Sequence, residues 1–251
     1  MPTQQPWSRP PVNAVMVKPA DDSTHPLASQ FSAFIAQSEF PCVGAKAALN
    51  RGGMRFVVAR EFKSAWDDLR ILPSLHDIGR AYRSDPIPFQ SLAVLFEGGA
   101  PDNEEAFEQG LWSRLGSLAA KDDWLGQRPD PRVAHDPGDP HFAMSFGGEA
   151  FFIVGLHPKA SRPARRFDTP AMVFNLHDQF QRLRAEGRYS ALSSAIRDRD
   201  RKLAGSDNPM LSEHGTVSPA RQYSGRAVGA DWRCPYSGRS STSSEDSALG
   251  Q

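Results

Sequence analysis

The chain has 251 residues, of which 39% are hydrophobic, so it is long enough for one well-buried core and falls within the size range of a single domain. Lys and Arg together number 29, as do Asp and Glu, and the formal net charge is zero. That balance offers no electrostatic attraction to nucleic acid or to an anionic membrane. No apolar run approaches the roughly 20 residues of a membrane-spanning helix, so we expect neither nucleic-acid nor membrane partners.

Cysteine content and the N-terminal segment both bear on location. Two cysteines in a chain of this size do not form a disulfide framework, and a reducing compartment keeps them as thiols. The N-terminal segment is polar and proline-rich, without the apolar stretch of a signal peptide. We therefore expect a cytoplasmic protein in which Cys42 and Cys234 are free.

Three regions follow from the distribution of proline, serine and apolar residues. Residues 1–26 carry repeated prolines and little periodicity, which is typical of an extended arm. Residues 237–251 are rich in serine and nearly devoid of bulky core formers, so this tail is expected to be disordered. The folded domain is predicted to span residues 27–236.

The first half of that domain has clear helix and strand signals. Apolar residues at helical spacing predict a helix over 27–35 that ends before Pro41. Short apolar runs at 55–59 and 91–96 predict two strands. Asp102 or Asn103 then provides the N-cap of a helix, whose first turn is acidic. Its apolar face is formed by Phe107, Leu111, Leu115 and Leu118.

The second half begins with an irregular stretch, because residues 122–141 contain four prolines. A hairpin around Gly147–Gly148 is predicted to join strands at 142–146 and 150–156. A further strand over 171–174 leads into a helix through Leu183, and a second helix runs from Tyr189 to Leu203. Strands and helices do not alternate regularly, which favours a single α+β domain with a mixed or mostly antiparallel sheet flanked by helices.

Cys42 is the first candidate for chemistry. It follows Phe40-Pro41 and precedes what reads as a short helix. A lone cysteine in this setting is a buried apolar filler, a nucleophile or a haem ligand. A helix N-terminus and Lys46 one turn later would both lower the pKa of the thiol.

A basic stretch after the hairpin is the second candidate. His157 follows a strand end and is succeeded by Arg162, Arg165 and Arg166. Such a cluster at the edge of a sheet either binds anions or forms a solvated basic turn in which the histidine bonds to backbone.

The residues leave two alternative sites open, one without a cofactor and one with iron. Cys42 paired with His157 or His141 would make a cofactor-free Cys-His hydrolase. His135, Asp136 and His141 would make a non-haem iron site, although the histidines show no zinc or His-Glu-x-x-His spacing.

Near the C-terminus, Tyr223 and Trp232 either close a pocket or hold the C-terminal extension on the core.

Several stretches together resemble the YqcI/YcgG family, whose members include haem-dependent N-hydroxylases of guanidine compounds. The resemblance covers residues 39–236. It is most specific at Phe40-Pro41-Cys42 and at 145–167, 175–180, 196–200 and 222–235.

This resemblance implies an O₂-using haem b monooxygenase that hydroxylates a guanidine-containing amino acid or metabolite. Cys42 would be the proximal ligand of the haem iron and His157 the alternative, because a thiolate favours O–O cleavage. Arg162, Arg165 and Arg166 would anchor the haem propionates. Electrons would come from an external donor or from peroxide. The alternative function is that of a non-catalytic haem carrier or gas sensor.

A guanidinium substrate also requires a carboxylate in fork geometry. We expect Glu149 or Asp139 to fill that role, with Trp124 as an aromatic neighbour, because all three lie in or beside the proline-rich loop and the hairpin.

Overall fold

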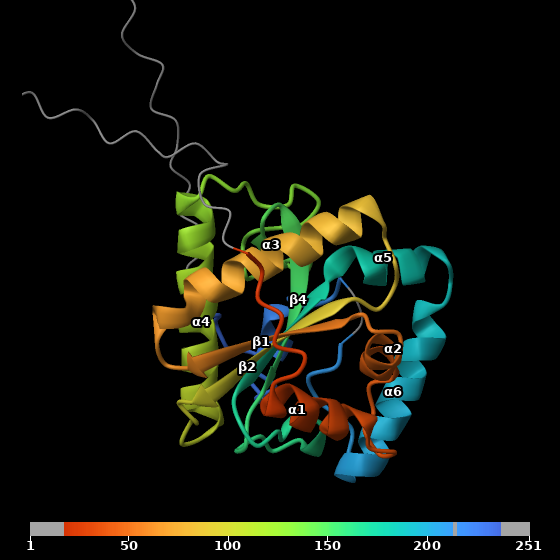
Figure 1. Ribbon diagram of the computed structural model, residues 1–251. Coiled ribbons are helices and arrows are strands. Elements are labelled where there is room, and N and C mark those ends of the chain that lie inside the picture. The colour runs from red at the N-terminus through yellow and green to blue at the C-terminus, as the bar shows by residue number, and fades with distance from the viewer. Residues whose placement is uncertain (1–17, 213–214, 237–251) are drawn as a thin grey trace, which may run out of the picture.

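One five-stranded sheet organises the protein, whose computed structural model describes residues 18–212 and 215–236 (Figure 1). The strand order is β1-β2-β5-β4-β3, with β1 and β2 parallel and every other neighbouring pair antiparallel. The predicted α+β class with a mixed sheet is confirmed. The strands are β1 (Met54–Glu61), β2 (Ser91–Gly98), β3 (Met144–Phe146), β4 (Glu149–Leu156) and β5 (Ala171–Leu176).

A helix that the sequence analysis missed connects the two parallel strands. Parallel neighbours require a long crossover, which α3 (Asp68–Ser84) provides after a short 3₁₀ turn at Ala65–Asp67. Pro73 lies inside this helix, where proline removes a backbone donor and normally argues against helical structure. The spacing of Ile71, Leu75, Ile78 and Tyr82, all buried, was the available signal.

One face of the sheet is filled by α3 and by α4 (Glu104–Trp124). Leu75 of α3 and Phe107 and Leu115 of α4 are fully buried against Val94 and Phe174 of the sheet. Asn103 caps α4 as predicted, since its side-chain oxygen accepts the Ala106 N–H at 2.8 Å. This face is a continuous apolar core.

The opposite face is covered by α1 (Pro26–Ala36), α2 (Val43–Asn50) and α6 (Tyr189–Ala204) (Figure 1). Phe31 packs edge-on against Phe56 and Phe167 and anchors α1. α6 has 16 residues, and Asp200 is its only buried residue. The long helix with the weakest apolar anchoring therefore covers this face.

The remaining predicted elements are also present. The β3–β4 hairpin turns at Gly147 and Gly148, both at positive φ, and β5 leads directly into α5 (His177–Ala185). Residues 125–143 are irregular, as expected, apart from an isolated bridge between Ala134 and Phe142. A second 3₁₀ turn spans Pro163–Arg165, and α7 spans Ala220–Tyr223.

The C-terminal extension is held on the core. Tyr223 is fully buried, stacks on Trp112 at 5.5 Å between ring centroids and donates its hydroxyl to the Phe151 carbonyl at 3.2 Å. Trp112 also stacks on Tyr236. Of the two roles considered for Tyr223, the structure assigns it the anchoring one.

Residues 18–25 contact the domain before α1 begins. The Asp22 carboxylate accepts the Val58 N–H at 2.7 Å and pairs with Arg70, and the Ala20 N–H donates to Ser74 Oγ at 3.0 Å. Most of the expected N-terminal arm and the whole of the expected Ser-rich tail lie outside the described residues. Within the described part of the chain, no helix combines the length and apolarity needed to cross a bilayer.

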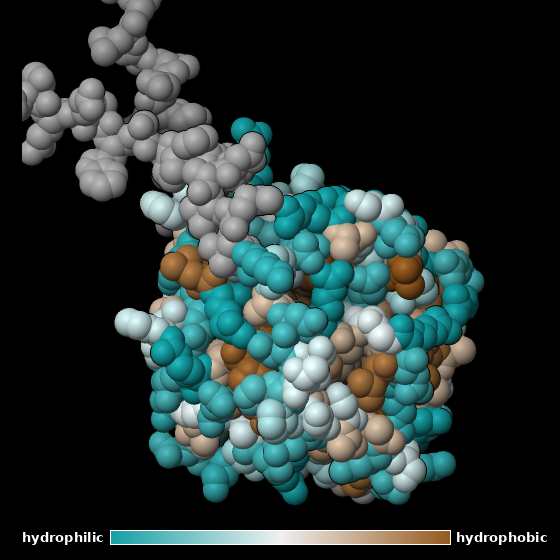
Figure 2. Space-filling view, viewed as in Figure 1, coloured by the Kyte–Doolittle hydropathy of each residue, from teal (hydrophilic) through white to brown (hydrophobic). Residues whose placement is uncertain are grey.

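Figure 2 shows the outer surface in the same orientation, with hydrophobic residues scattered in separate patches among hydrophilic ones. Scattered apolar residues are normal on a folded surface and need no partner.

A buried ion pair holds α3 to α4, and its removal is expected to be costly. Asp68 has no exposed surface and accepts from Arg114, from Ser117 Oγ at 2.6 Å and from Lys121 Nζ at 2.8 Å. Asp68→Asn removes the carboxylate that pairs directly with the buried Arg114 guanidinium, so we expect a loss of about 3–5 kcal/mol in the free energy of unfolding, measured in urea.

The matched control is Asp198→Asn, because Asp198 is an exposed carboxylate on α6. It should change the free energy of unfolding by no more than about 0.5 kcal/mol. Equal effects of the two substitutions would show that the buried pair does not hold the helices.

Candidate functional site

Cys42 caps the N-terminus of α2. Its Sγ accepts the Ala45 N–H at 3.4 Å, and its backbone is extended, as an N-cap residue requires. Pro41 precedes it and keeps α1 and α2 separate. The sulfur therefore lies at the positive end of a helix, as the sequence predicted.

The surroundings of this thiol act on its pKa in opposite directions. Burial raises the pKa of Cys42, while the N–H groups of Ala45 and Gly44 and the charge of Arg165 lower it. Burial is the largest effect, so the pKa is raised overall and the group is a neutral thiol at pH 7. A bound metal would deprotonate it, because coordination to a metal displaces the thiol proton.

A cavity of about 180 Å³ lies beside Cys42, between the sheet and α6. Most of its walls are apolar and come from α1, the strands β1, β4 and β5, and α6. A few polar side chains line it as well. The apolar set includes Phe31, Ile35, Phe40, Met54, Val154, Leu156, Val173, Ile196 and Leu211; the polar set is Cys42, Arg165, Asn175, Asp200 and Asn208.

Arg165 contributes a positively charged side chain to the lining of this cavity. Its guanidinium donates to the carbonyls of Gly155 at 2.9 Å, Gln222 at 3.2 Å and Tyr223 at 3.3 Å. Burial lowers its pKa to about 10, which still leaves it charged at neutral pH. No carboxylate pairs directly with Arg165 among the described residues, so its charge is held by backbone dipoles next to the Cys42 sulfur.

The other two predicted arginines have different partners. Arg162 pairs with Asp200 of α6 and donates to the Ser206 carbonyl at 3.0 Å. Arg166 is exposed and donates to the carbonyls of Ala160 and Ser161. The structure thus brings Arg165 into the cavity, places Arg162 behind Asp200 and leaves Arg166 outside.

His157 lies on the other face of the sheet. It is 1% exposed and stacks on Phe107 of α4, with 4.1 Å between ring centroids. Its Nδ1 is buried without a hydrogen-bond partner among the described residues, and burial lowers the pKa of His157 to about 4. His157 does not line the Cys42 cavity, so the structure separates the two candidate iron ligands.

The two carboxylates expected to bind a guanidinium also lie away from the cavity. Glu149 is buried and pairs with Arg83 at 3.1 Å and Arg132 at 2.9 Å, so two guanidinium groups of the protein itself already hold it. Asp139 accepts the His141 N–H at 2.7 Å within the irregular loop. Trp124, the expected aromatic neighbour, is exposed at the end of α4.

Asp200 is the carboxylate that does line the cavity, and the sequence analysis did not select it. It is 6% exposed and binds Arg162 through Oδ2, and no described residue donates to its Oδ1. The available signal was its position: Ile196, Asp200 and Leu203 follow helical spacing, so a carboxylate interrupts an otherwise apolar face.

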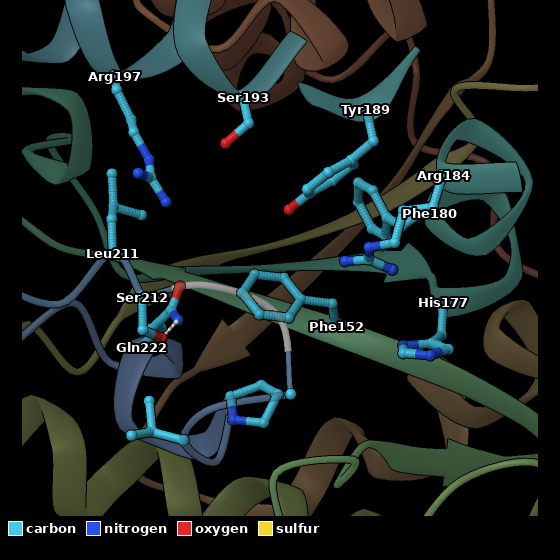
Figure 3. A pocket seen from close by; sticks show the side chains of 13 residues that line it. Phe152, His177, Phe180, Arg184, Tyr189, Ser193, Arg197, Leu211, Ser212 and Gln222 are labelled. Carbon is cyan, nitrogen blue, oxygen red and sulfur yellow. Dashed lines mark hydrogen bonds between the residues drawn. The ribbon is translucent and has the colours of Figure 1, made fainter. Parts of the chain in front are cut away.

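A second cavity of about 130 Å³ adjoins the first beneath α6, and Leu211 lines both (Figure 3). Phe152 of β4 and Phe180 of α5 form apolar walls, and Tyr189, Ser193 and Arg197 reach in from α6. α6 therefore covers two neighbouring cavities on one face of the sheet.

Comparison with known proteins identifies the family. The model of the YqcI/YcgG family matches residues 31–237, which is most of the chain. The chain belongs to the YqcI/YcgG family. No curated protein and no solved structure matched significantly. Cys42, its cavity and both neighbouring arginines all lie within the matched residues.

No group of three or more His, Cys, Asp or Glu side chains suited to a metal ion occurs in the described ranges. His135, Asp136 and His141 are thus not assembled into such a group. Cys42 is also not paired with a histidine in its cavity.

The buried position of His157 predicts a pH dependence of stability. Its pKa is about 4 when folded and about 6.5 when unfolded, so protons bind preferentially to the unfolded chain as the pH falls from about 6.5 to 4. The stability contribution is complete above pH 6.5 and declines by up to about 3 kcal/mol by pH 4. His157→Phe, which keeps a ring on Phe107, should remove that decline in urea unfolding.

His135→Asn is the control, because His135 is exposed. It should retain the acid-side decline of the parent protein. If His157→Phe retains the decline as well, burial of His157 does not cause it.

Proposed function

We propose that the protein is a haem-dependent N-hydroxylase of a guanidine compound, with haem b bound through Cys42. The supporting observation is the position of Cys42 Sγ at the N-terminus of α2, beside a mostly apolar cavity that is also lined by the positively charged side chain of Arg165. The resemblance of the YqcI/YcgG family to guanidine N-hydroxylases supplies the reaction class.

The donor set beside Cys42 fits a thiolate-bound haem. The Ala45 N–H would stabilise the coordinated thiolate, because hydrogen bonds to a ligating sulfur tune the metal. Apolar walls exclude water from the macrocycle, and Arg165 offers a positive charge to a propionate. When bound, haem would supply the activation of O₂ that forms the new N–O bond.

The cavity volume implies that α6 must move for haem to enter. About 180 Å³ is below the roughly 300–1,000 Å³ of common ligand pockets and is smaller than a tetrapyrrole. α6 is suited to move, since few of its side chains are buried and the Arg162–Asp200 pair is a main attachment. Outward displacement of α6 would enlarge both cavities and leave the opposite core intact.

Asp200 is the best supported partner for the substrate guanidinium. Its Oδ2 already binds the guanidinium of Arg162, and its Oδ1 accepts from no described residue. A substrate guanidinium on Oδ1 would lie in the same cavity as Cys42. The carboxylate would hold the guanidinium in place and favour its protonated form.

An external donor or peroxide would provide the electrons, as expected from the sequence. The Cys-His hydrolase is less well supported, because the Cys42 thiol is neutral and His157 lies across the sheet. A haem carrier or gas sensor would share the Cys42 site but would not consume O₂ in response to a guanidine.

Cys42→Ser tests the ligand assignment without loss of the helix cap, because serine is a good N-cap residue. The parent protein, reconstituted with haem and reduced under carbon monoxide, should show the long-wavelength Soret band of a thiolate ligand. Cys42→Ser should lose this band, as measured by absorption spectroscopy. An unchanged band would eliminate Cys42 as the ligand.

Cys234→Ser is the matched control. Cys234 is the other free cysteine, and burial raises the pKa of its thiol to about 12. This variant should keep the band of the parent protein. A histidine-type band in the parent protein would instead favour His157.

Asp200→Asn should raise the KM for a guanidine substrate by at least about tenfold, because a charge-assisted hydrogen bond contributes about 1.5–3 kcal/mol. The Soret band should be unchanged. Glu149→Gln and Asp139→Asn test the two carboxylates predicted from the sequence. If either of these raises KM while Asp200→Asn does not, the substrate binds there.

A further inference from the structure

The second cavity beneath α6 is lined by different side chains from those of the Cys42 cavity, apart from Leu211. It lies between β4, α5, α6 and the described residues 211–212 and 215–222, and it meets the Cys42 cavity only at Leu211 among their described lining residues. About 130 Å³ accommodates roughly four water molecules, which suits a single small ring with a polar head group and is too little for a macrocycle.

Three polar groups of α6 converge on this space. Arg197, Ser193 and Tyr189 lie on successive turns and point inward together (Figure 3). None of these three side chains has a hydrogen-bond or ion-pair partner among the described residues. An exposed arginine without a carboxylate partner, next to two free hydroxyls, is a ready set of donors for an anion.

The described residues that line this cavity carry positive charge and no negative charge. Arg184 and Arg197 both contribute, and none of the described lining residues is Asp or Glu. Arg184 is held over the Tyr189 ring at 4.2 Å, and its Nε–H is buried without a partner in the described structure.

The opposite walls are apolar and aromatic. Phe152 and Phe180 meet edge-on at 6.3 Å between ring centroids, and Val217 and Pro219 continue the surface. Aromatic walls favour a flat apolar body, which offset or edge-on ring contacts stabilise. The cavity thus combines an anion-binding side with a ring-binding side.

The geometry points to a binding site for a small aromatic carboxylate, with the carboxylate on Arg197, Ser193 and Tyr189 and the ring against Phe152 and Phe180. This site does not depend on haem, because Cys42 and Arg165 do not line it.

Benzoate is the probe that tests the site on the full-length protein, with binding followed by saturation-transfer NMR and calorimetry at constant ionic strength. The parent protein should bind benzoate at least about tenfold more tightly than benzamide, its neutral isostere. Phenyl phosphate tests whether the head-group site prefers a phosphate. Failure to bind benzoate, or equal affinity for benzoate and benzamide, would overturn the inference.

Arg197→Gln should weaken benzoate binding at least about tenfold, and benzamide binding should not change. Arg199→Gln is the matched control, because Arg199 is an exposed arginine of the same helix that does not line the cavity. Equal losses in the two variants would show a general charge effect and overturn the site. Because Arg197 is exposed and unpaired, its substitution should leave the thermal unfolding midpoint unchanged.

Discussion

The unequal packing of the two faces of the sheet is the constraint on which the rest of the structure depends. On one face α3 and α4 pack against the sheet around a continuous apolar core, with Phe107 and Phe174 fully buried. On the other face α6 spans two cavities and buries only Asp200. A close-packed interior resists insertion of a ligand, while a face with voids under a weakly anchored helix does not. The two cavities described above therefore lie on the α6 side of the sheet.

Arg165 and Arg162, in the segment that follows β4, tie the α6 side of the sheet to neighbouring parts of the chain. Arg165 binds the carbonyls at the end of β4 and at α7, and in this way fixes a positive charge beside Cys42. Arg162 reaches the carboxylate of Asp200 and so holds α6 down. One short basic segment thus both supplies the positive charge of the Cys42 cavity and holds α6, which covers that cavity.

The sequence predicted those features that depend on residues close together in the chain. It did not predict features that depend on how distant elements pack against one another. The caps at Asn103 and Cys42 and the glycine turn of the hairpin depend on neighbouring residues, and all were predicted. α3 was missed because Pro73 lies inside it. The side of the sheet on which His157 lies follows from strand register, so spacing alone did not separate it from Cys42. Asp200 enters the site only through the packing of α6.

Hydrogen exchange with and without haem tests the central claim that the α6 side of the sheet is the binding face. Mass spectrometry of the full-length protein would measure exchange of backbone amides in each helix. The account predicts that haem slows exchange in α2 and α6 and leaves α3 and α4 unchanged. Slower exchange confined to α4 and the segment around His157 would contradict the account and place the ligand on the opposite face.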